Sequence, residues 1–367
     1  MLTVNAGSSS LKLRLLDDDA LLASRDLPAA GGGIDTEEVT VAISELPATE
    51  AIGHRIVHGG ERFHGPVRID SEVEAALRGL IDLAPLHQPK SLAALDVVGE
   101  VLPGTPAVAC FDTAFHATLP PAAATYALPG SWRKRFGLRR YGFHGLSHAY
   151  ASRRAAEILG RADLRLVICH LGAGASLAAV RDGRSVDTTM GFTPLEGLVM
   201  ATRSGSVDPG LLLWLLEREA IGEREMAEAL EHDSGLLGLA GSADVREVLE
   251  RAAAGDEGAR LARDVYIHRL RALIAAMVAS LGGIDGLVFT GGVGENSAEV
   301  RALAVGGLGF LSAALDPDRN SAPSGDRDVS AEGSAVAVVV VAAREDLEIA
   351  AQVRDLLGDD KRPVTEA

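Results

Sequence analysis

Residues 164–188 read LRLVICHLGAGASLAAVRDGRSVDT and predict most about the fold. The apolar run 164–169 is typical of a buried strand, residues 172–174 form a tight glycine loop, and residues 176–180 are a second apolar strand. The Asp-Gly pair at 182–183 is a strong hairpin signal that leads into a third strand at 184–188. The stretch therefore predicts strand, glycine loop, strand, turn, strand.

The same order of signals occurs at the start of the chain. Strands are expected at 2–4, 11–16 and 21–23, with a glycine-serine loop at 7–10 and an acidic turn at 17–19. We interpret the recurrence as an internal duplication rather than as two unrelated hairpins. Two copies of a mixed α/β unit predict two lobes with a nucleotide cleft between them, because each glycine loop offers backbone N–H groups to phosphate.

Helical periodicity covers most of the remaining chain. Ser71 and Glu74 have the spacing of a capping box, and Ser147 is expected to cap a later helix. The expected helices are 71–83, 89–101, 147–160, 211–219, 223–231, 244–254, 257–281 and 345–357, and further strands are expected at 287–290 and 336–341.

Composition narrows the class of protein. The chain has 367 residues, of which 47% are hydrophobic, and this is enough for two domains. A formal net charge of −16 predicts no nucleic-acid or anionic-membrane partner. Cys110 and Cys169 lie in apolar runs and are expected to be buried thiols. Asn5 and Gly7 interrupt the first apolar run, so no signal peptide is expected and the protein is predicted to be cytoplasmic.

Three small-residue loops are candidates for phosphate binding. The first, NAGSSSLK at 5–12, combines serine hydroxyls with the charge of Lys12 and the amide oxygen of Asn5, which suits hydrated magnesium. The others are HLGAGAS at 170–176 and TGGVGEN at 290–296, a strand-to-helix turn. The first loop lacks the spacing of a Walker A loop, and a loop of this kind taken alone is more often a simple turn.

Five longer motifs resemble those of the acetate kinase family. They are VNAGSSSLK at 4–12, GHRIVHGG at 53–60, FDTAFH at 111–116, YGFHG at 141–145 and TTMGFTPLEG at 188–197. The resemblance implies a duplicated actin-like ATPase fold, related to ribonuclease H. It also implies reversible, Mg²⁺-dependent, in-line phosphoryl transfer between ATP and acetate, which gives acetyl phosphate and ADP. It further implies a homodimer, with one lobe at 1–115 plus 347–367 and a nucleotide-binding and dimerisation lobe at 116–346.

The resemblance also implies roles for individual residues. Arg55 and Arg203 would clamp the carboxylate and the transferring phosphoryl group, since a guanidinium forks onto oxyanions, and His144 would donate to a phosphoryl oxygen. Asn5 and Glu345 would hold Mg²⁺ or Mn²⁺. The acyl pocket would contain Arg55 with Val57, Leu86, Phe143 and Pro194. The expected ATP-binding residues are Lys12, His170, Leu171, Gly172, Ala173, Gly174, Asp244, Val245, Arg246, Gly292, Val293, Gly294, Glu295 and Asn296.

Asp112 corresponds to the family's supposed proton donor or acceptor. A carboxylate acceptor is already an anion and needs no base, whereas a sugar hydroxyl must lose a proton. We therefore expect Asp112 to orient magnesium or its water.

Several positions carry further expectations. Ala173 stands where the family has asparagine, Arg344 stands where a small polar residue is expected, and Asp244 can simply cap its helix. A solvated basic face is expected at Arg133, Lys134, Arg135, Arg139 and Arg140.

Three other functions remain open from the sequence. A sugar kinase of the same fold would use Asp112 as a true base and would need a polar pocket. A nucleotide-dependent module of the actin or chaperone kind would not need Arg55 and Arg203 at the phosphate. A metal hydrolase would use histidines, for instance the i,i+4 pair His144 and His148.

Overall fold

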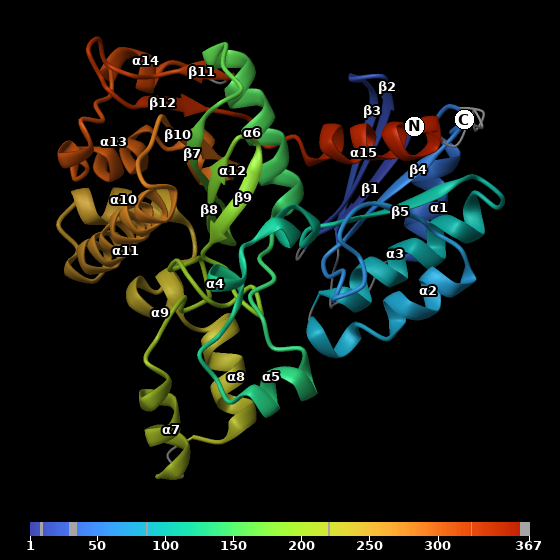
Figure 1. Cartoon of the computed structure of the whole chain (residues 1–367), viewed down its shortest axis with the longest axis horizontal. Coiled ribbons are helices and arrows are strands. Elements are labelled where there is room, and N and C mark those ends of the chain that lie inside the picture. Colours follow the sequence, from blue (N-terminus) through green and yellow to red (C-terminus); the bar gives the residue numbers. More distant parts are fainter. Residues whose placement is uncertain (8–9, 29–34, 86, 219–220, 324, 360–367) are drawn as a thin grey trace. The chain divides into compact units, whose positions relative to one another are not determined.

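The computed structural model describes residues 1–7, 10–28, 35–85, 87–218, 221–323 and 325–359 (Figure 1). They form two compact units. The described residues of unit 1 fall within Met1–Ala117, His144–Tyr150 and Arg344–Ala367, and those of unit 2 within Thr118–Phe143 and Ala151–Ala343. Leu86, an expected acyl-pocket residue, and Ser8 and Ser9 of the first loop lie outside the described residues.

Unit 1 is built on a six-stranded sheet with the order β3-β2-β1-β4-β6-β5. The antiparallel hairpins β1-β2-β3 form one side, β1, β4 and β6 are parallel, and β5 is antiparallel to β6. The strands are β1 (Leu2–Ala6), β2 (Ser10–Asp17), β3 (Ala20–Pro28), β4 (Ile52–Ile56), β5 (Val67–Arg68) and β6 (Ala107–Phe111).

Both faces of this sheet are covered. On β6, Val108 and Cys110 pack with Ile349 and Val353 of α15 (Glu345–Asp359), while Phe111 faces the opposite core. Figure 1 shows the helices of that opposite core grouped together in unit 1. They are α1 (Thr36–Ser44), α2 (Ser71–Arg78) and α3 (Gln88–Val101).

Unit 2 repeats the arrangement with the order β9-β8-β7-β10-β12-β11. The hairpins β7-β8-β9 are antiparallel, β7, β10 and β12 are parallel, and β11 is antiparallel to β12. Strand order and direction therefore match those of unit 1, which confirms the duplication inferred from the sequence. The strands are β7 (Arg165–Leu171), β8 (Ala175–Arg181), β9 (Arg184–Thr188), β10 (Gly286–Thr290), β11 (Arg327–Asp328) and β12 (Ala337–Val340).

Helices surround the sheet of unit 2. The 25-residue α11 (Glu257–Leu281) packs on β8 and β9, with Asp256 as its N-cap. The helix α6 (Gly145–Leu159) begins in unit 1 and continues in unit 2. The others are α4 (Pro121–Ala124), α5 (Gly130–Phe136), α7 (Pro209–Glu217), α8 (Glu223–His232), α9 (Gly235–Ala240), α10 (Val245–Ala253), α12 (Gly291–Asn296), α13 (Ala298–Gly306) and α14 (Pro317–Ser321). Short 3₁₀ turns are η2 (Ile81–Leu83), η3 (Ala114–Thr118) and η4 (Gly309–Leu311).

Some expected boundaries were wrong. Asp70, not Ser71, caps α2, because its side chain accepts from the backbone N–H of Val73 at 2.8 Å. The expected helix 71–83 breaks after Arg78, where Gly79 follows and a separate 3₁₀ turn begins. Ser147 is no cap, since α6 already begins at Gly145. None of the helices in the described ranges is long and apolar enough to cross a membrane.

Candidate functional site

A cluster of four polar side chains lies at one edge of the sheet of unit 1. Asn5 is on β1, Arg55 is on β4 and Asp112 directly follows β6, so the carboxyl ends of three parallel strands bring them together. The Arg55 guanidinium forks onto Asp112, with Nε 3.1 Å from both carboxylate oxygens and Nη2 2.5 Å from Oδ2. Its Nη1 donates to Asn5 Oδ1 at 3.1 Å and to the Ala6 carbonyl at 3.2 Å.

Glu345 joins this cluster from the other end of the sequence. It opens α15, and its Oε2 accepts from Asn5 Nδ2 at 2.6 Å. The two expected metal ligands therefore touch, and the Arg55 guanidinium connects them to a third oxygen-bearing side chain, Asp112. Amide and carboxylate oxygens are the donors that Mg²⁺ prefers, so the residues fit this ion.

Burial shapes the electrostatics of the cluster. Asp112 is 1% exposed, and burial raises its pKa while the Arg55 guanidinium offsets part of that rise. Burial alone would lower the pKa of Arg55, but the charges of Asp112 and Glu345 outweigh it and hold that pKa above the usual range. Arg55 therefore keeps its positive charge at any working pH.

The backbone directly after His144 contacts Asp112 of the same cluster. Gly145 donates its backbone N–H to the Asp112 carbonyl at 2.8 Å, and a Cβ on Gly145 would lie 2.2 Å from that oxygen. His144 itself has φ = 57°, a left-handed conformation that is uncommon and costly for a residue with a side chain. His148, one turn later, packs edge-on against His116 at 5.6 Å between ring centroids.

The second and third glycine loops lie side by side in unit 2. They follow the parallel strands β7 and β10, in which His170 pairs with Thr290. The second loop is closed by a hydrogen bond from Gly172 N to the Gly174 carbonyl at 3.0 Å. The third stretch turns directly into the short helix α12 after β10, and within it the Asn296 amide donates to the Gly292 carbonyl at 2.9 Å.

Two expected ATP-binding positions have structural partners. The Glu295 carboxylate accepts from the backbone N–H of Ala343 at 2.9 Å. Asp244 accepts from Arg246 N at 2.9 Å and pairs with the Arg246 guanidinium at 2.7 Å, so it caps α10 as the alternative interpretation expected. Val245 is the first residue of that helix.

Arg301 was missed by the sequence analysis. Its side chain is buried on α13 and donates to the carbonyls of Gly294 and Glu295, each at 2.8 Å, and to Asn320 on α14. Burial lowers its pKa to about 10, so it stays charged at neutral pH. The sequence places Arg301 seven residues after Gly294, but an arginine on the surface of the protein could stand at the same spacing. The sequence alone therefore did not identify Arg301 as a buried residue.

Arg203 also has well-defined partners. Its Nη1 donates to the Pro194 carbonyl at 3.2 Å, and its Nε lies 3.3 Å from the Glu231 carboxylate. Burial lowers the pKa of Arg203, and Glu231 opposes this effect. Glu231 was not expected to matter, because nothing in the sequence of α8 distinguishes it from its acidic neighbours.

Three of the expected acyl-pocket residues in the described ranges, Val57, Phe143 and Pro194, are buried. Val57 belongs to unit 1, and Phe143 and Pro194 belong to unit 2. Lys12 is exposed on β2, where it pairs in register with Asn5.

The two departures from the family differ in their surroundings. The Ala173 side chain is exposed, and its carbonyl accepts from Ala201 N at 3.1 Å. Arg344 pairs with Asp346 at 2.9 Å.

The expected basic face was wrong for Arg140. Its side chain is 17% exposed, pairs with Glu196 at 2.6 Å and donates to the carbonyls of Thr189 and Met190. Arg140 faces inward because the loop after β9 supplies these acceptors. A charge pattern alone does not show where such a loop runs.

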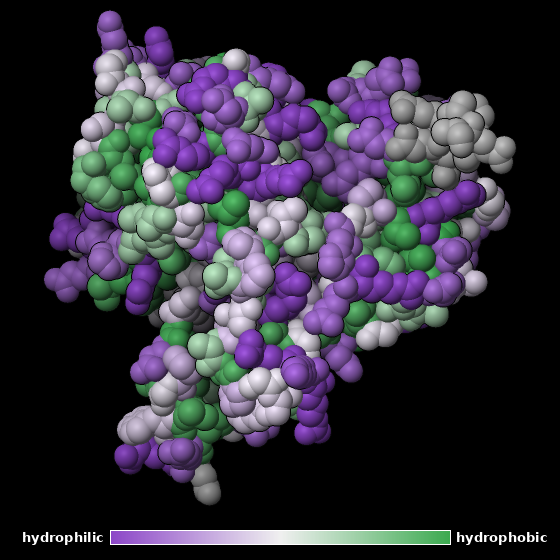
Figure 2. Space-filling view, in the orientation of Figure 1, coloured by the Kyte–Doolittle hydropathy of each residue, from purple (hydrophilic) through white to green (hydrophobic). Residues whose placement is uncertain are grey.

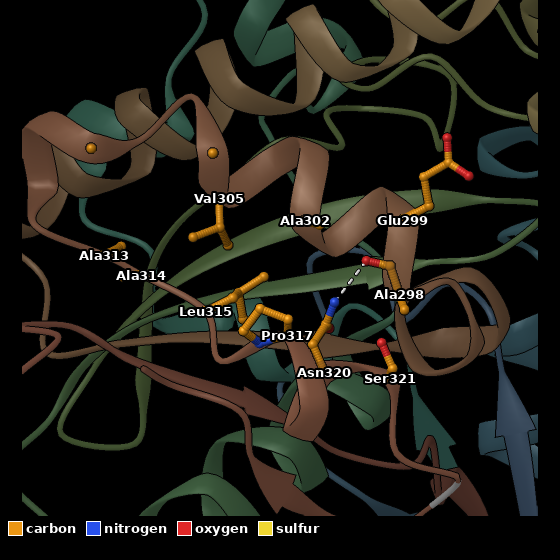
Figure 3. A pocket seen from close by; sticks show the side chains of 12 residues that line it. Ala298, Glu299, Ala302, Val305, Ala313, Ala314, Leu315, Pro317, Asn320 and Ser321 are labelled. Atoms are coloured by element: carbon orange, nitrogen blue, oxygen red, sulfur yellow. Dashed lines mark hydrogen bonds between the residues drawn. The ribbon is translucent and has the colours of Figure 1, made fainter. Parts of the chain in front are cut away.

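A surface cavity of about 530 Å³ lies between α13 and α14 (Figure 3). Its lining is mostly small and apolar, and Asn320 donates to the Ala298 carbonyl at its edge. The residues assigned to phosphate, acyl group or metal are not part of this lining. Within the described ranges, no group of three or more His, Cys, Asp or Glu side chains is arranged to hold a metal ion.

Comparison with known proteins assigns the family. The model of the acetokinase family matches residues 33–351. An acetate kinase of Leifsonia xyli subsp. xyli is 47% identical over 386 aligned residues, which cover 96% of this chain and 97% of the relative. An acetate kinase of a Nostoc species is 43% identical and is covered over 99% of its length.

Solved structures agree with this assignment. An acetate kinase from Porphyromonas gingivalis superposes with a TM-score of 0.88 at 37% identity, covering 97% of this chain and 99% of that one. A propionate kinase from Francisella tularensis gives the same TM-score at 35% identity, covering 96% and 98%. Fold and site thus define a phosphotransferase with a duplicated actin-like ATPase fold. The chain belongs to the acetokinase family, whose members are kinases with a carboxyl group as acceptor.

Proposed function

We propose that this kinase transfers the γ-phosphoryl group of ATP directly to acetate, giving acetyl phosphate and ADP, and that it catalyses the reverse reaction as well. The observation that carries the proposal is the cluster of Arg55, Asp112, Asn5 and Glu345. It combines a fixed cation for an oxyanion with oxygen donors suited to magnesium.

The chemistry is an in-line displacement. An acetate oxygen forms a bond to the γ-phosphorus, and the bond from that phosphorus to the bridging oxygen of ADP breaks. Acetate is an anion at neutral pH, so no proton has to be removed. Catalysis then depends on positioning and on neutralising negative charge. Arg55 and Arg203 supply that positive charge, and His144 donates to a phosphoryl oxygen.

Magnesium would be held by Asn5 and Glu345, either directly or through water. When bound, it would neutralise charge on the phosphates of ATP. Asp112 orients magnesium or its water, and it also holds the Arg55 guanidinium in a single plane through the fork.

The nucleotide is proposed to bind to the glycine loops after β7 and β10. Gly172, Ala173 and Gly174 of the second loop, and residues 292–296 of α12, would contact phosphate or nucleoside, together with the adjacent His170 and Leu171. Lys12 would add its charge from the first loop. Asp244, Val245 and Arg246 would contact the adenosine.

Acyl-chain length would be discriminated by Val57, Phe143 and Pro194, together with Leu86. One additional methylene is worth about 0.8 kcal/mol, so this selection is weak and propionate is expected to be a second substrate.

The chain is further proposed to form a homodimer through α7. Leu211, Leu213 and Trp214 of this helix are exposed, and α7 has no buried residue. Figure 2 shows apolar surface over this helix. An apolar helix left in water is typical of a subunit contact, and a second copy is the simplest partner.

We also propose a cytoplasmic location, since the substrates are ATP and ADP and both cysteines are buried free thiols. The proposed lobes are 1–115 plus 347–367, and 116–346.

The experiment that tests the activity uses the full-length protein with Mg-ATP and one short carboxylate at a time, and hydroxylamine traps any acyl phosphate as a hydroxamate. Acetate should give the highest kcat/KM, followed by propionate and then butyrate. Absence of hydroxamate from all three carboxylates would overturn the proposal.

A further inference from the structure

Three partly buried side chains with no part in the proposed chemistry form a network in unit 2. The Tyr126 hydroxyl donates to Glu196 Oε2 at 2.6 Å, and Arg140 Nη2 donates to Glu196 Oε1 at 2.6 Å. Each oxygen of this carboxylate therefore has its own donor. The Arg140 guanidinium also lies over the Tyr126 ring, 5.5 Å from its centroid. We call these three residues the loop clamp.

The loop clamp grips the backbone on both sides of Gly191. Before it, Arg140 Nη1 donates to the carbonyls of Thr189 and Met190, both at 3.1 Å. After it, the Tyr126 hydroxyl accepts from the backbone N–H of Phe192 at 2.9 Å. A loop without regular secondary structure is thereby fixed by side-chain hydrogen bonds, several of them charge-assisted.

Gly191 has to lack a side chain for the clamp to form. A Cβ at this position would lie 1.8 Å from Glu196 Oε2 and 2.2 Å from the Tyr126 hydroxyl oxygen, the two atoms of the central hydrogen bond. The Gly191 carbonyl also accepts from the backbone N–H groups of Tyr141 and Gly142, at 3.0 and 3.2 Å. The clamp and the chain that leads to Phe143 thus meet at one glycine.

The segment between Gly191 and Glu196 reaches the proposed substrate groups through Pro194. The Pro194 carbonyl accepts from Arg203 Nη1 at 3.2 Å, and Pro194 itself is a proposed wall of the acyl pocket. Phe143, another proposed wall, follows the two residues bound to Gly191. A shift of this loop would therefore move Pro194, Arg203 and Phe143 together. The glycine loops for the nucleotide follow β7 and β10, and the loop after β7 contacts the chain further on, where Ala201 N donates to the Ala173 carbonyl at 3.1 Å.

We infer that Tyr126, Arg140 and Glu196 are positioning residues that set the affinity and size selection for the carboxylate while leaving nucleotide binding alone. The inference rests on the proposed function. Burial, together with the hydrogen bond to Glu196, raises the pKa of Tyr126, so its hydroxyl remains a donor across the working range.

The test measures KM separately for acetate and for Mg-ATP in Tyr126→Phe and Glu196→Gln. Both changes keep the size of the side chain and remove one charge-assisted contact. KM for acetate should rise about tenfold, the effect of losing one such bond, while KM for ATP stays close to that of the unchanged protein. The ratio of kcat/KM for propionate to that for acetate should rise, because a looser loop admits the longer chain.

Asp285→Asn provides the matched control. Asp285 accepts from the Arg165 backbone N–H and from its guanidinium, at 2.8 to 3.1 Å, at the start of β7 in the same unit. This variant loses a comparable ion pair, so its melting temperature should fall by a similar amount without any split between the two KM values. Arg140→Lys should lie between Glu196→Gln and the unchanged protein, since it keeps the charge and loses the fork.

The outcomes separate this inference from the proposed function. If the unchanged protein makes no hydroxamate, both the proposed function and this inference are wrong. If it is active but the clamp variants change the two KM values equally, or change neither while melting like Asp285→Asn, the loop clamp is purely structural and the inference alone is wrong.

Discussion

Arg55 and Asp112, 57 positions apart in the chain, form a forked ion pair in which the guanidinium contacts both carboxylate oxygens, at 2.5 to 3.1 Å. Neighbouring parallel strands, β4 and β6, carry the two residues to the same edge. The fork fixes the plane of the guanidinium, and a positioned cation stabilises a transition state better than a mobile one. This pair, together with Asn5 and Glu345, leads to the first prediction.

Breaking the fork from either side should give different magnesium dependence. Asp112→Asn should lower kcat about a hundredfold, and high magnesium should restore part of the loss, because the proposed ion-orienting role is then met by mass action. Arg55→Lys should lose about a hundred- to a thousandfold in kcat without such recovery, since lysine cannot fork. Steady-state kinetics at several magnesium concentrations distinguishes the two. An Asp112→Asn loss that no magnesium concentration relieves would contradict the ion-orienting role.

The pH profile should have an acid limb caused by Asp112. Burial raises the pKa of this carboxyl, so activity should fall on acidification from above its ordinary value of about 4. Because the folded-state pKa is raised, the folded protein binds this proton more tightly than the unfolded chain, and acidification through that range does not unfold the protein through Asp112. Activity should therefore fall while the circular dichroism signal is unchanged. An acid limb that persists unaltered in Asp112→Asn would show that another group titrates.

Gly145→Ala should disturb the backbone contact between Asp112 and the segment that carries His144. The new Cβ would lie 2.2 Å from the Asp112 carbonyl, so the two segments must move apart. We expect a loss of about 1–3 kcal/mol in the free energy of unfolding, together with a large fall in kcat.

Gly99→Ala is the matched control for this change. Gly99 is exposed on α3 with open space around its Cα, and alanine there should stabilise the protein by about 0.5–1 kcal/mol. Thermal melts and kinetics of both variants test the prediction. Normal kcat in Gly145→Ala would mean that this contact has no catalytic role.

Ala173→Asn should improve the enzyme. The Ala173 side chain is exposed at the tip of the second glycine loop, so an asparagine fits without displacing neighbours. Its amide can donate to phosphate or carboxylate, and one hydrogen bond to a charged group is worth up to about tenfold in kcat/KM. Ala173→Asp has nearly the same shape but the opposite preference for anions, and it should lower kcat/KM. Equal effects of both substitutions would contradict a role in anion binding.

Leu213→Glu should convert the proposed dimer to a monomer. Leu213 is 58% exposed on α7, and a charge there would have to be buried in a subunit contact without a partner. Light scattering coupled to size-exclusion chromatography measures the mass directly. Val41→Glu, a similarly exposed apolar position on α1 of unit 1, should leave the mass unchanged. A monomeric unchanged protein would rule out the dimer itself.

Local sequence patterns determined much of the fold and the family. The hairpin at 164–188 could be recognised because alternating strand and turn signals act within a few residues, and its Asp182-Gly183 turn has positive φ at both positions, as such a pair favours. The repeat of that pattern implied the duplication, and long motifs implied the chemistry. Helix ends were predicted less accurately. The N-terminus of α2, for example, is set by the carboxylate of Asp70, next to the serine from which a cap was expected.

Only the tertiary structure decided which of the marked residues act together. Asn5 and Glu345 are 340 positions apart, and their contact depends on α15 returning to the first sheet. The same holds for Arg140. The sequence predicted a surface charge, whereas in the structure Arg140 donates to acceptors in the loop after β9. A side chain's partners depend on packing between distant segments. Local sequence propensity does not depend on that packing. The loop clamp and the fork of Arg55 could therefore be found only in the tertiary structure.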